Sequence, residues 1–175
     1  ADEAEVLYEG LVNEAPFKSF AEYPLAFFGL GYCAYALGED SLAVTRFGRF
    51  LQMYDSDMDL VIEARLRMAD AMFRMRDYAG AASVYEEVSK MNYQQESSVY
   101  AAYQCAVSYG LISETGRKVS MLEGIISRRD DTPMYSRAVY ELGRTYVQEG
   151  MADKATRCFR YLLEDIGDLL QCGRL

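Results

Sequence analysis

The sequence contains no histidine and no tryptophan, and it has only three prolines and four cysteines among its 175 residues. The absence of histidine removes the commonest general base and proton shuttle of enzymes. It also excludes Ser-His and Cys-His nucleophile pairs and every zinc site that uses imidazole ligands. No other nucleophile stands beside a base in the chain, so we expect a protein that is not an enzyme.

Long apolar runs and clusters of positive charge are also missing. The most apolar stretch, residues 25–37, is shorter than the roughly 18 residues that a membrane span requires. The net charge of −9 repels phosphate backbones and anionic membrane surfaces. We therefore expect no nucleic-acid partner and no direct membrane span. A hydrophobic content of 51% indicates a folded chain rather than a disordered one.

The cysteines do not form a recognisable metal or redox motif. Cys33, Cys105, Cys158 and Cys172 show no C-x-x-C spacing. The first three lie in apolar helical stripes, where free cysteines act as small buried hydrophobic residues. Their redox state and the compartment of the protein stay open.

Two short motifs resemble cofactor or metal sites, but their surroundings favour structural roles. The stretch GLGYCA at 29–34 matches G-x-G-x-x-A, yet the residues before it have a helical and not a strand pattern. The stretch DSDMD at 55–59 resembles the start of a calcium loop, but Leu60 and Leu66 occupy the positions of its glycine and glutamate. We therefore predict neither a cofactor nor a metal ion.

A pattern of small and large residues recurs along the chain. Four segments that begin at Leu30, Met68, Cys105 and Leu142 start 37 or 38 residues apart. Small residues let two antiparallel helices approach, and a large side chain on the second helix fills the space opposite. The second position of each segment is small and a later position is large, in the pairs Gly31 and Phe47, Ala69 and Tyr85, Ala106 and Leu122, and Gly143 and Phe159.

This pattern resembles the tetratricopeptide repeat, whose consensus has Leu-Gly followed by Tyr in one helix and Ala and Phe in the next. The fourth copy is the most similar, through Leu142, Gly143, Tyr146, Gly150, Ala155 and Phe159. The third differs most, because Lys118 stands where alanine is expected, so we expect a looser helix crossing there. The resemblance implies an all-α fold, a right-handed α-solenoid of about four helical hairpins preceded by a lone helix.

The repeat frame divides the chain as one tetratricopeptide domain over residues 1–175. Its parts are a half repeat at 2–14, four repeats at 17–53, 60–91, 96–128 and 133–165, and a C-terminal stub at 166–175. Within the first repeat we expect helices at 17–37, or from 20 if Pro24 lies in the first turn, and at 40–53. Because the chain opens on half a repeat, we expect a fragment of a longer protein.

The period of 37–38 residues is longer than the 34 residues that are usual for this family. Longer repeats of this kind are similar to those of bacterial cell-envelope proteins, such as the TolA-binding periplasmic protein and outer-membrane assembly lipoproteins. The resemblance implies a periplasmic or envelope location rather than a cytoplasmic one.

The resemblance also implies where a partner would bind, since the first helices of such hairpins line a concave groove. Tyr and Arg, which dominate binding hot spots, are frequent at these positions. A groove of this composition suits a peptide with apolar anchors and some acidic character, although the tyrosines could instead pack between adjacent repeats. The candidate binding residues are Phe28, Tyr32, Tyr35, Arg67, Asp70, Phe73, Arg74, Tyr100, Tyr103, Tyr140, Arg144 and Gln148.

Two functions remain open after this reasoning. The first is a non-catalytic scaffold that binds a protein or peptide in its Tyr-rich groove. The alternative is a structural segment of a larger protein that stacks, or forms a homodimer, through its uncapped ends. The Lys and Asn pattern with which related domains clamp chaperone carboxyl termini is missing, since Tyr103, Tyr140 and Asp70 are among the residues at those positions.

Overall fold

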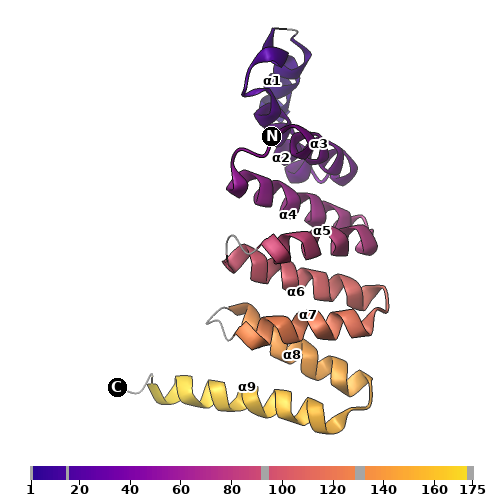
Figure 1. Cartoon of the computed structure of the whole chain (residues 1–175), viewed down its shortest axis with the longest axis vertical. Coiled ribbons are helices and arrows are strands. Elements are labelled where there is room, and N and C mark those ends of the chain that lie inside the picture. The colour runs from indigo at the N-terminus through magenta and orange to yellow at the C-terminus, as the bar shows by residue number, and fades with distance from the viewer. Residues whose placement is uncertain (1, 15, 92–94, 129–132, 173–175) are drawn as a thin grey trace. The chain divides into compact units, whose positions relative to one another are not determined.

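The computed structural model describes residues 2–14, 16–91, 95–128 and 133–172, and within them it contains nine α-helices, one short 3-10 turn and no strand. The predicted all-α helical-repeat fold is confirmed. The helices are α1 (Asp2–Asn13), α2 (Tyr23–Leu37), α3 (Asp40–Met53), α4 (Met58–Arg74), α5 (Tyr78–Met91), α6 (Gln95–Leu111), α7 (Thr115–Arg128), α8 (Pro133–Gln148) and α9 (Ala152–Cys172), with the turn η1 at Phe17–Ser19 (Figure 1). They form two compact units, Ala1–Ala101 and Ala102–Leu175.

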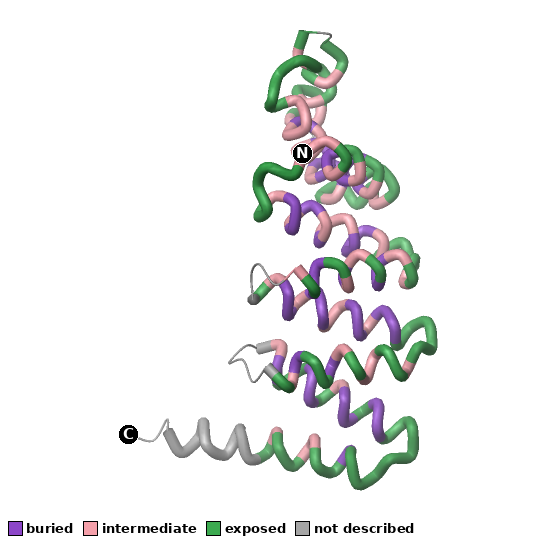
Figure 2. The backbone as a smooth tube through the Cα atoms, in the orientation of Figure 1, coloured by how far each residue is buried: buried purple, intermediate pink, exposed green. Residues whose placement is uncertain are grey.

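The first unit is a series of helices in which α1 packs on α2, α2 on α3, α3 on α4 and α4 on α5. Its core lies where α2, α3 and α4 meet, and Figure 2 shows the buried residues as stripes along these helices. Phe47 and Phe50 of α3 are completely buried there, among alanines and against the aromatic rings of α2. The fully buried alanines of this core are Ala34, Ala43, Ala64 and Ala71.

The small residues make room for the aromatic rings that the sequence pairs with them. A Cβ atom placed on Gly31 would lie 2.7 Å from Cδ1 of Phe47, closer than van der Waals contact permits. In the second unit, a Cβ on Gly143 would lie 2.8 Å from Cε1 of Phe159. Both glycines are therefore required by close helix packing and not by an unusual backbone conformation.

A buried arginine attaches α1 to the rest of the first unit. Arg46 of α3 places its two terminal nitrogens 2.7 Å from Glu5 and 2.7 Å from Glu9 of α1. It also donates to the carbonyl oxygen of Leu30 at 3.3 Å. With an exposed fraction of only 8%, Arg46 depends on these acceptors to offset the loss of its hydration.

Two helix starts differ from the predicted ones by two residues or more, and each has a local reason. The helix expected from residue 17 or 20 begins at Tyr23, because the chain first forms η1 and then extends at Phe20. Pro24 lies in the first turn of α2, where its missing N–H is tolerated. The second difference is at α4, which begins at Met58 because the side chain of Asp57 accepts hydrogen bonds from the first-turn backbone N–H groups. The DSDMD stretch thus contains a helix N-cap.

The second unit contains the unexpected lysine of the third repeat. The aliphatic chain of Lys118 on α7 lies against Gly110 of α6, where a Cβ would be 3.0 Å from its Cδ atom. Its ammonium nitrogen lies 3.4 Å from Glu141 of α8, and only 14% of the lysine side chain is exposed. The missing alanine of α7 is therefore compensated by a glycine on the facing helix.

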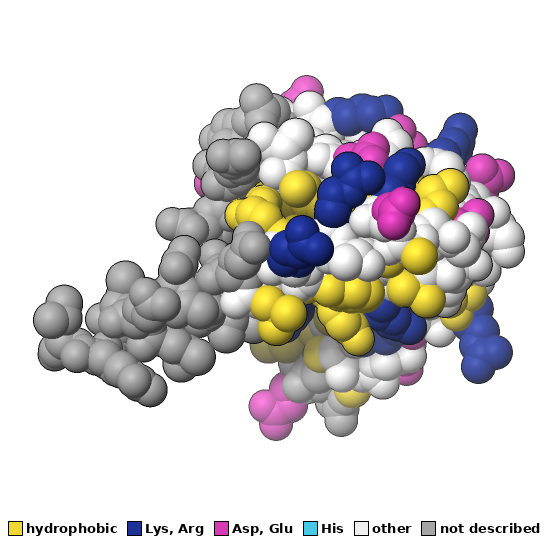
Figure 3. All heavy atoms as spheres, turned by 90° about the horizontal axis from the view of Figure 1, so that it is seen from below, with side chains coloured by type: hydrophobic (Ala, Val, Ile, Leu, Met, Phe, Trp, Pro, Cys, Tyr) yellow, Lys and Arg dark blue, Asp and Glu magenta, His cyan; other side chains and the backbone are white. Residues whose placement is uncertain are grey.

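The last helix, α9, continues beyond the predicted end of the fourth repeat at 165 and reaches Cys172. The helix thus includes residues 166–172 of the expected stub, and residues 173–175 lie outside the described part of the chain. Where its side chains are described, α9 buries Ala155 and exposes Arg157, Arg160 and Tyr161. Figure 3, viewed from the side on which α9 lies in Figure 1, shows basic side chains beside hydrophobic ones.

Candidate functional site

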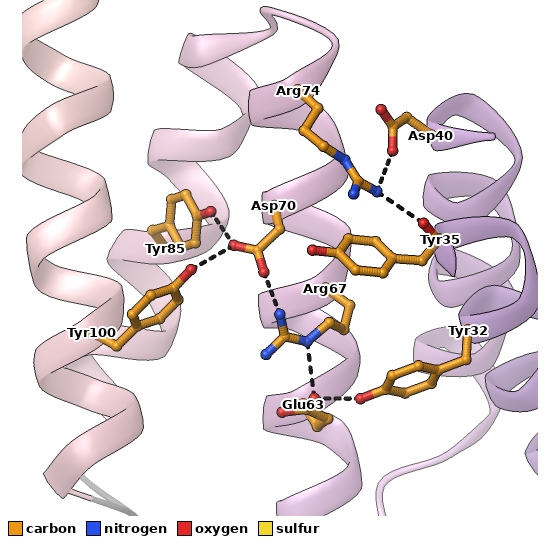
Figure 4. A network of polar contacts seen from close by, with 9 residues as sticks. All are labelled: Tyr32, Tyr35, Asp40, Glu63, Arg67, Asp70, Arg74, Tyr85 and Tyr100. Carbon is orange, nitrogen blue, oxygen red and sulfur yellow. Dashed lines mark hydrogen bonds and ion pairs between the residues drawn. The ribbon is translucent and has the colours of Figure 1, made fainter. Parts of the chain in front are cut away.

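Nine residues of the first unit form what we name the polar network. They come from α2, α4, α5 and α6 and from the first residue of α3, and Figure 4 shows them together. Glu63 accepts hydrogen bonds from the hydroxyl of Tyr32 and from Nε of Arg67, the latter at 2.9 Å. The members are Tyr32, Tyr35, Asp40, Glu63, Arg67, Asp70, Arg74, Tyr85 and Tyr100.

Asp70 is the centre of this network. One of its carboxylate oxygens accepts hydrogen bonds from the hydroxyls of Tyr85 and Tyr100, the second at 3.0 Å. The other oxygen lies 2.6 Å from a terminal nitrogen of Arg67. Asp70 is only 9% exposed, so its charge is buried but fully provided with donors.

The second arginine of the network stacks on an aromatic ring. The guanidinium carbon of Arg74 lies 3.9 Å from the ring centroid of Tyr35, within the range of a cation–π interaction. Arg74 also forms an ion pair with Asp40 and donates to the backbone oxygen of Tyr35 at 3.2 Å. Both arginines of the network therefore already have carboxylate partners.

The network changes the acidity of its members in opposite directions. Burial, together with the hydrogen bond to Glu63, raises the pKa of Tyr32 well above its ordinary value. Burial alone would raise the pKa of Glu63, but the hydrogen bonds from Tyr32 and Arg67 lower that pKa below its usual value. Burial and the charge of Asp70 raise the pKa of Tyr85. Tyr32 and Tyr85 thus stay protonated donors, while the Glu63 carboxylate stays charged.

A different surface lies along α8 in the second unit, and we name it the α8 strip. Its residues recur at helical spacing on the side of α8 that faces away from the buried positions, and all of them are exposed. Tyr140 is 51% exposed and Val147 is 58% exposed, whereas most large hydrophobic residues whose burial the structure describes are more buried. The α8 strip consists of Arg137, Tyr140, Arg144, Val147 and Gln148.

Contacts within the second unit hold the α8 strip in place. The ring centroids of Tyr140 and Phe159 lie 6.2 Å apart. The guanidinium carbon of Arg144 lies 5.9 Å from the ring centroid of Tyr140. Arg144 also forms an ion pair of 2.9 Å with Glu141. Tyr103 of α6 is half-buried, and burial together with the charge of Glu141 raises its pKa while Arg137 and Arg144 oppose the rise.

The structure separates the predicted binding residues into three groups. Six belong to the polar network, namely Tyr32, Tyr35, Arg67, Asp70, Arg74 and Tyr100. Three belong to the α8 strip, namely Tyr140, Arg144 and Gln148, with Tyr103 in electrostatic range of it. The remaining two pack against other aromatic rings: Phe28 lies 5.1 Å from Phe50 in the core, and Phe73 lies 5.2 Å from Tyr78.

Sequence reasoning missed several residues of both surfaces. Glu63 stands four residues before Arg67, a spacing that pairs charges on one helix face and could have identified it. Val147 and Arg137 share the helical face of the predicted Tyr140 and could have been found in the same way. The bond from Tyr85 to Asp70 joins two helices and has no signal in the sequence.

The described residues offer little to a metal ion or to a bilayer. No group of three or more Cys, Asp and Glu side chains among them could hold a metal ion. In the same part of the chain, none of the helices is both long enough and apolar enough to cross a membrane.

Helical hairpins recur along the described chain, and in two of them a glycine faces a phenylalanine ring, at Gly31 and Phe47 and at Gly143 and Phe159. This arrangement defines the class of all-α helical-repeat proteins. The model of the tetratricopeptide repeat family matches residues 25–56 and 63–91, which contain α2 with α3 and α4 with α5. These two hairpins are therefore tetratricopeptide repeats, and the predicted resemblance to that family is confirmed. The curated proteins compared with the chain include no match.

Solved structures share the fold along nearly the whole chain. A structure of MamA is 20% identical, with a TM-score of 0.75, and the match covers 97% of this chain and 91% of that one. A putative kinesin light chain from Podosopora anserina with TPR-like repeats is 17% identical, with a TM-score of 0.73 and coverage of 97% and 88%. YrrB, described as a TPR protein with an unusual peptide-binding site, is 16% identical, with a TM-score of 0.71 and coverage of 99% and 84%.

Proposed function

We propose that this protein is a non-catalytic scaffold for protein–protein interaction, which binds a peptide or a segment of a partner protein on the exposed faces of its helices. Tetratricopeptide arrays, as a class, present extended surfaces of this kind to partners. The peptide-binding site named for YrrB, which has a similar fold, also supports the proposal. The lack of histidine throughout the chain is consistent with a role without catalysis.

The observation that carries the proposal is the exposure of the α8 strip. Most tyrosines of the polar network donate their hydroxyl hydrogen bonds to carboxylates of the first unit. These tyrosines therefore fit the alternative in which tyrosines pack between adjacent repeats rather than bind a partner. Tyr140, in contrast, is half exposed and rests against Phe159 and Arg144, so its free face is available and its position is restricted. An exposed, braced tyrosine beside arginines has the composition of a binding hot spot.

The test is to probe an immobilised peptide library with the labelled protein and with its Tyr140→Ala variant. We expect the wild-type protein to select peptides and the variant to lose roughly tenfold or more in affinity for them, as at a hot spot. Tyr161→Ala is the matched control, because Tyr161 is an exposed tyrosine of the same unit, 43% exposed. Equal losses in both variants, at unchanged helical content, would show that the α8 strip is not the binding surface.

A second candidate function is assembly with another copy through α1, and the exposed apolar side chains of that helix favour it. Val6 is 68% exposed and Leu7 is 71% exposed. Light scattering over a range of protein concentrations tests this, and a strict monomer would exclude it. A location in the bacterial cell envelope stays a proposal that rests on the length of the repeat.

A further inference from the structure

The polar network of the first unit is poorly suited to an acidic ligand, although it contains two arginines. Arg67 lies between Glu63 and Asp70, at 2.9 Å and 2.6 Å. Arg74 is paired with Asp40 and stacked on a ring. Three carboxylates therefore surround two guanidinium groups, and an incoming carboxylate would meet surplus negative charge.

The α8 strip has the opposite balance. Glu141 is shared between Lys118, at 3.4 Å, and Arg144, at 2.9 Å, so one carboxylate faces two cations. Arg137 adds a third cation, it is exposed, and it forms no ion pair with any carboxylate in the described part of the chain. This local excess of positive charge occurs in a chain whose net charge is −9.

Apolar and cationic side chains alternate along the same face. Arg137, Tyr140, Arg144 and Val147 follow one another at intervals of three or four residues, which places them in one row along the helix. Tyr140 and Val147 are the exposed apolar members of the row, and Arg144 is 52% exposed at its side chain. A ligand that lies along α8 would therefore meet apolar contacts and charged donors in turn.

We infer that the α8 strip binds an acidic segment of a partner protein, with Asp or Glu side chains on Arg137 and Arg144 and apolar side chains on Tyr140 and Val147. The inference rests on the proposed scaffold function and names the chemistry of its ligand. Arginine recognises carboxylates through paired N–H donors, and the exposed Arg137, which has no carboxylate partner among the described residues, can form that pair at little cost. Arg144 keeps Glu141, but it shares that carboxylate with Lys118. Neither arginine of the polar network has this freedom.

The probes are three fluorescein-labelled synthetic peptides of equal length in which leucines alternate with Glu, with Gln or with Lys. Fluorescence anisotropy measures their binding to the whole protein. We expect the Glu peptide to bind most tightly, and added salt to weaken it, because exposed charge pairs are screened. The double variant Arg137→Gln with Arg144→Gln should reduce its affinity roughly three- to tenfold, the effect of two exposed ion pairs.

The matched control is the double variant Arg157→Gln with Arg160→Gln, which removes the same charge from exposed positions of α9 in the same unit. Its affinity for the Glu peptide should change less than about twofold, because these charges lie outside the binding row. Equal losses in the two double variants, or a Glu peptide that binds no better than the Gln peptide, would overturn the inference and leave the scaffold function standing. If none of the three peptides binds, the inference fails, whereas the scaffold function fails only if the peptide library also yields no binder.

Discussion

The substitution Gly31→Ala tests the packing that the repeat pattern predicts. The added Cβ would lie 2.7, 2.7 and 2.9 Å from three ring carbons of Phe47, where ordinary contacts are about 3.4–4 Å. The ring is completely buried, so it has no solvent-filled space into which it could move. Overpacking of this kind costs about 1–3 kcal/mol, whereas alanine in place of glycine gains about 1 kcal/mol of helix propensity. We expect a net loss of about 1 kcal/mol or more in the free energy of unfolding.

Urea titration followed by circular dichroism measures this loss, and thermal unfolding provides a second reading. A loss of about 1 kcal/mol lowers the Tm of a chain of this size by about 2–4 °C. Gly48→Ala is the matched control, because Gly48 lies within α3 and no atom comes within 4 Å of its added Cβ. That variant should gain about 0.5–1 kcal/mol from helix propensity alone.

The double variant Gly31→Ala with Phe47→Leu separates close packing from other effects. A smaller side chain at position 47 leaves room for the Cβ, so the cost of Gly31→Ala should be smaller in this background, as a double-mutant cycle would record. The reasoning is refuted if Gly31→Ala stabilises the protein as Gly48→Ala does, or if its cost is unchanged when residue 47 is leucine.

Three further predictions follow from the contacts within each unit. Arg46→Met removes the ion pairs that hold α1, and we expect amide hydrogen exchange in α1 to become roughly tenfold faster while α5 is unaffected. Asp70→Ala leaves the buried hydroxyl of Tyr85 without its acceptor, and we expect the free energy of unfolding to fall by about 2–4 kcal/mol in urea titration. Burial and the hydrogen bond to Glu123 raise the pKa of Tyr146 to about 12. Because the unfolded tyrosine ionises near pH 10, the stability that this group contributes is complete below about pH 10 and is lost as the pH rises toward 12, which urea titrations at a series of alkaline pH values will show.

Each of these three predictions has a result that contradicts it. Faster exchange throughout the first unit, rather than in α1 alone, would mean that Arg46 supports the whole core. An Asp70→Ala variant as stable as the wild type would show that the polar network contributes no net stability. For Tyr146, the variant Tyr146→Phe should show a smaller alkaline loss than the wild type, and an identical pH profile would assign the loss to other groups.

The repeat pattern predicted the all-α helical-repeat fold because it reports on contacts between the two helices of a hairpin. A small residue opposite a large one, as at Gly31 and Phe47, lets two helices cross closely, so the spacing of the pair marks both helices at once. The start of α2 was predicted too early, because apolar periodicity continues through residues that form η1 and an extended turn. Pro24 was the only local signal of the true start.

The candidate site was less accessible to sequence reasoning. The positions of Tyr32 and Tyr140 on their helices follow from periodicity, but their environments do not. Tyr32 donates to Glu63 on another helix, whereas Tyr140 stays half exposed. Whether a tyrosine is used internally depends on which side chains reach it from neighbouring helices, and a pattern along one helix contains no such information.

The lysine that replaces alanine in the third repeat limits how freely its helices could be exchanged. Lys118 needs the bare backbone of Gly110 on one side and the carboxylate of Glu141 on the other, so α6, α7 and α8 carry matched residues. A chimera in which α5 was transplanted into the place of α7 would bring Ala81 to this position, leave a gap above Gly110 and remove one of the two cations that face Glu141. Helices α6, α7 and α8 are thus matched to one another around Lys118, and a chimera would have to exchange the three together.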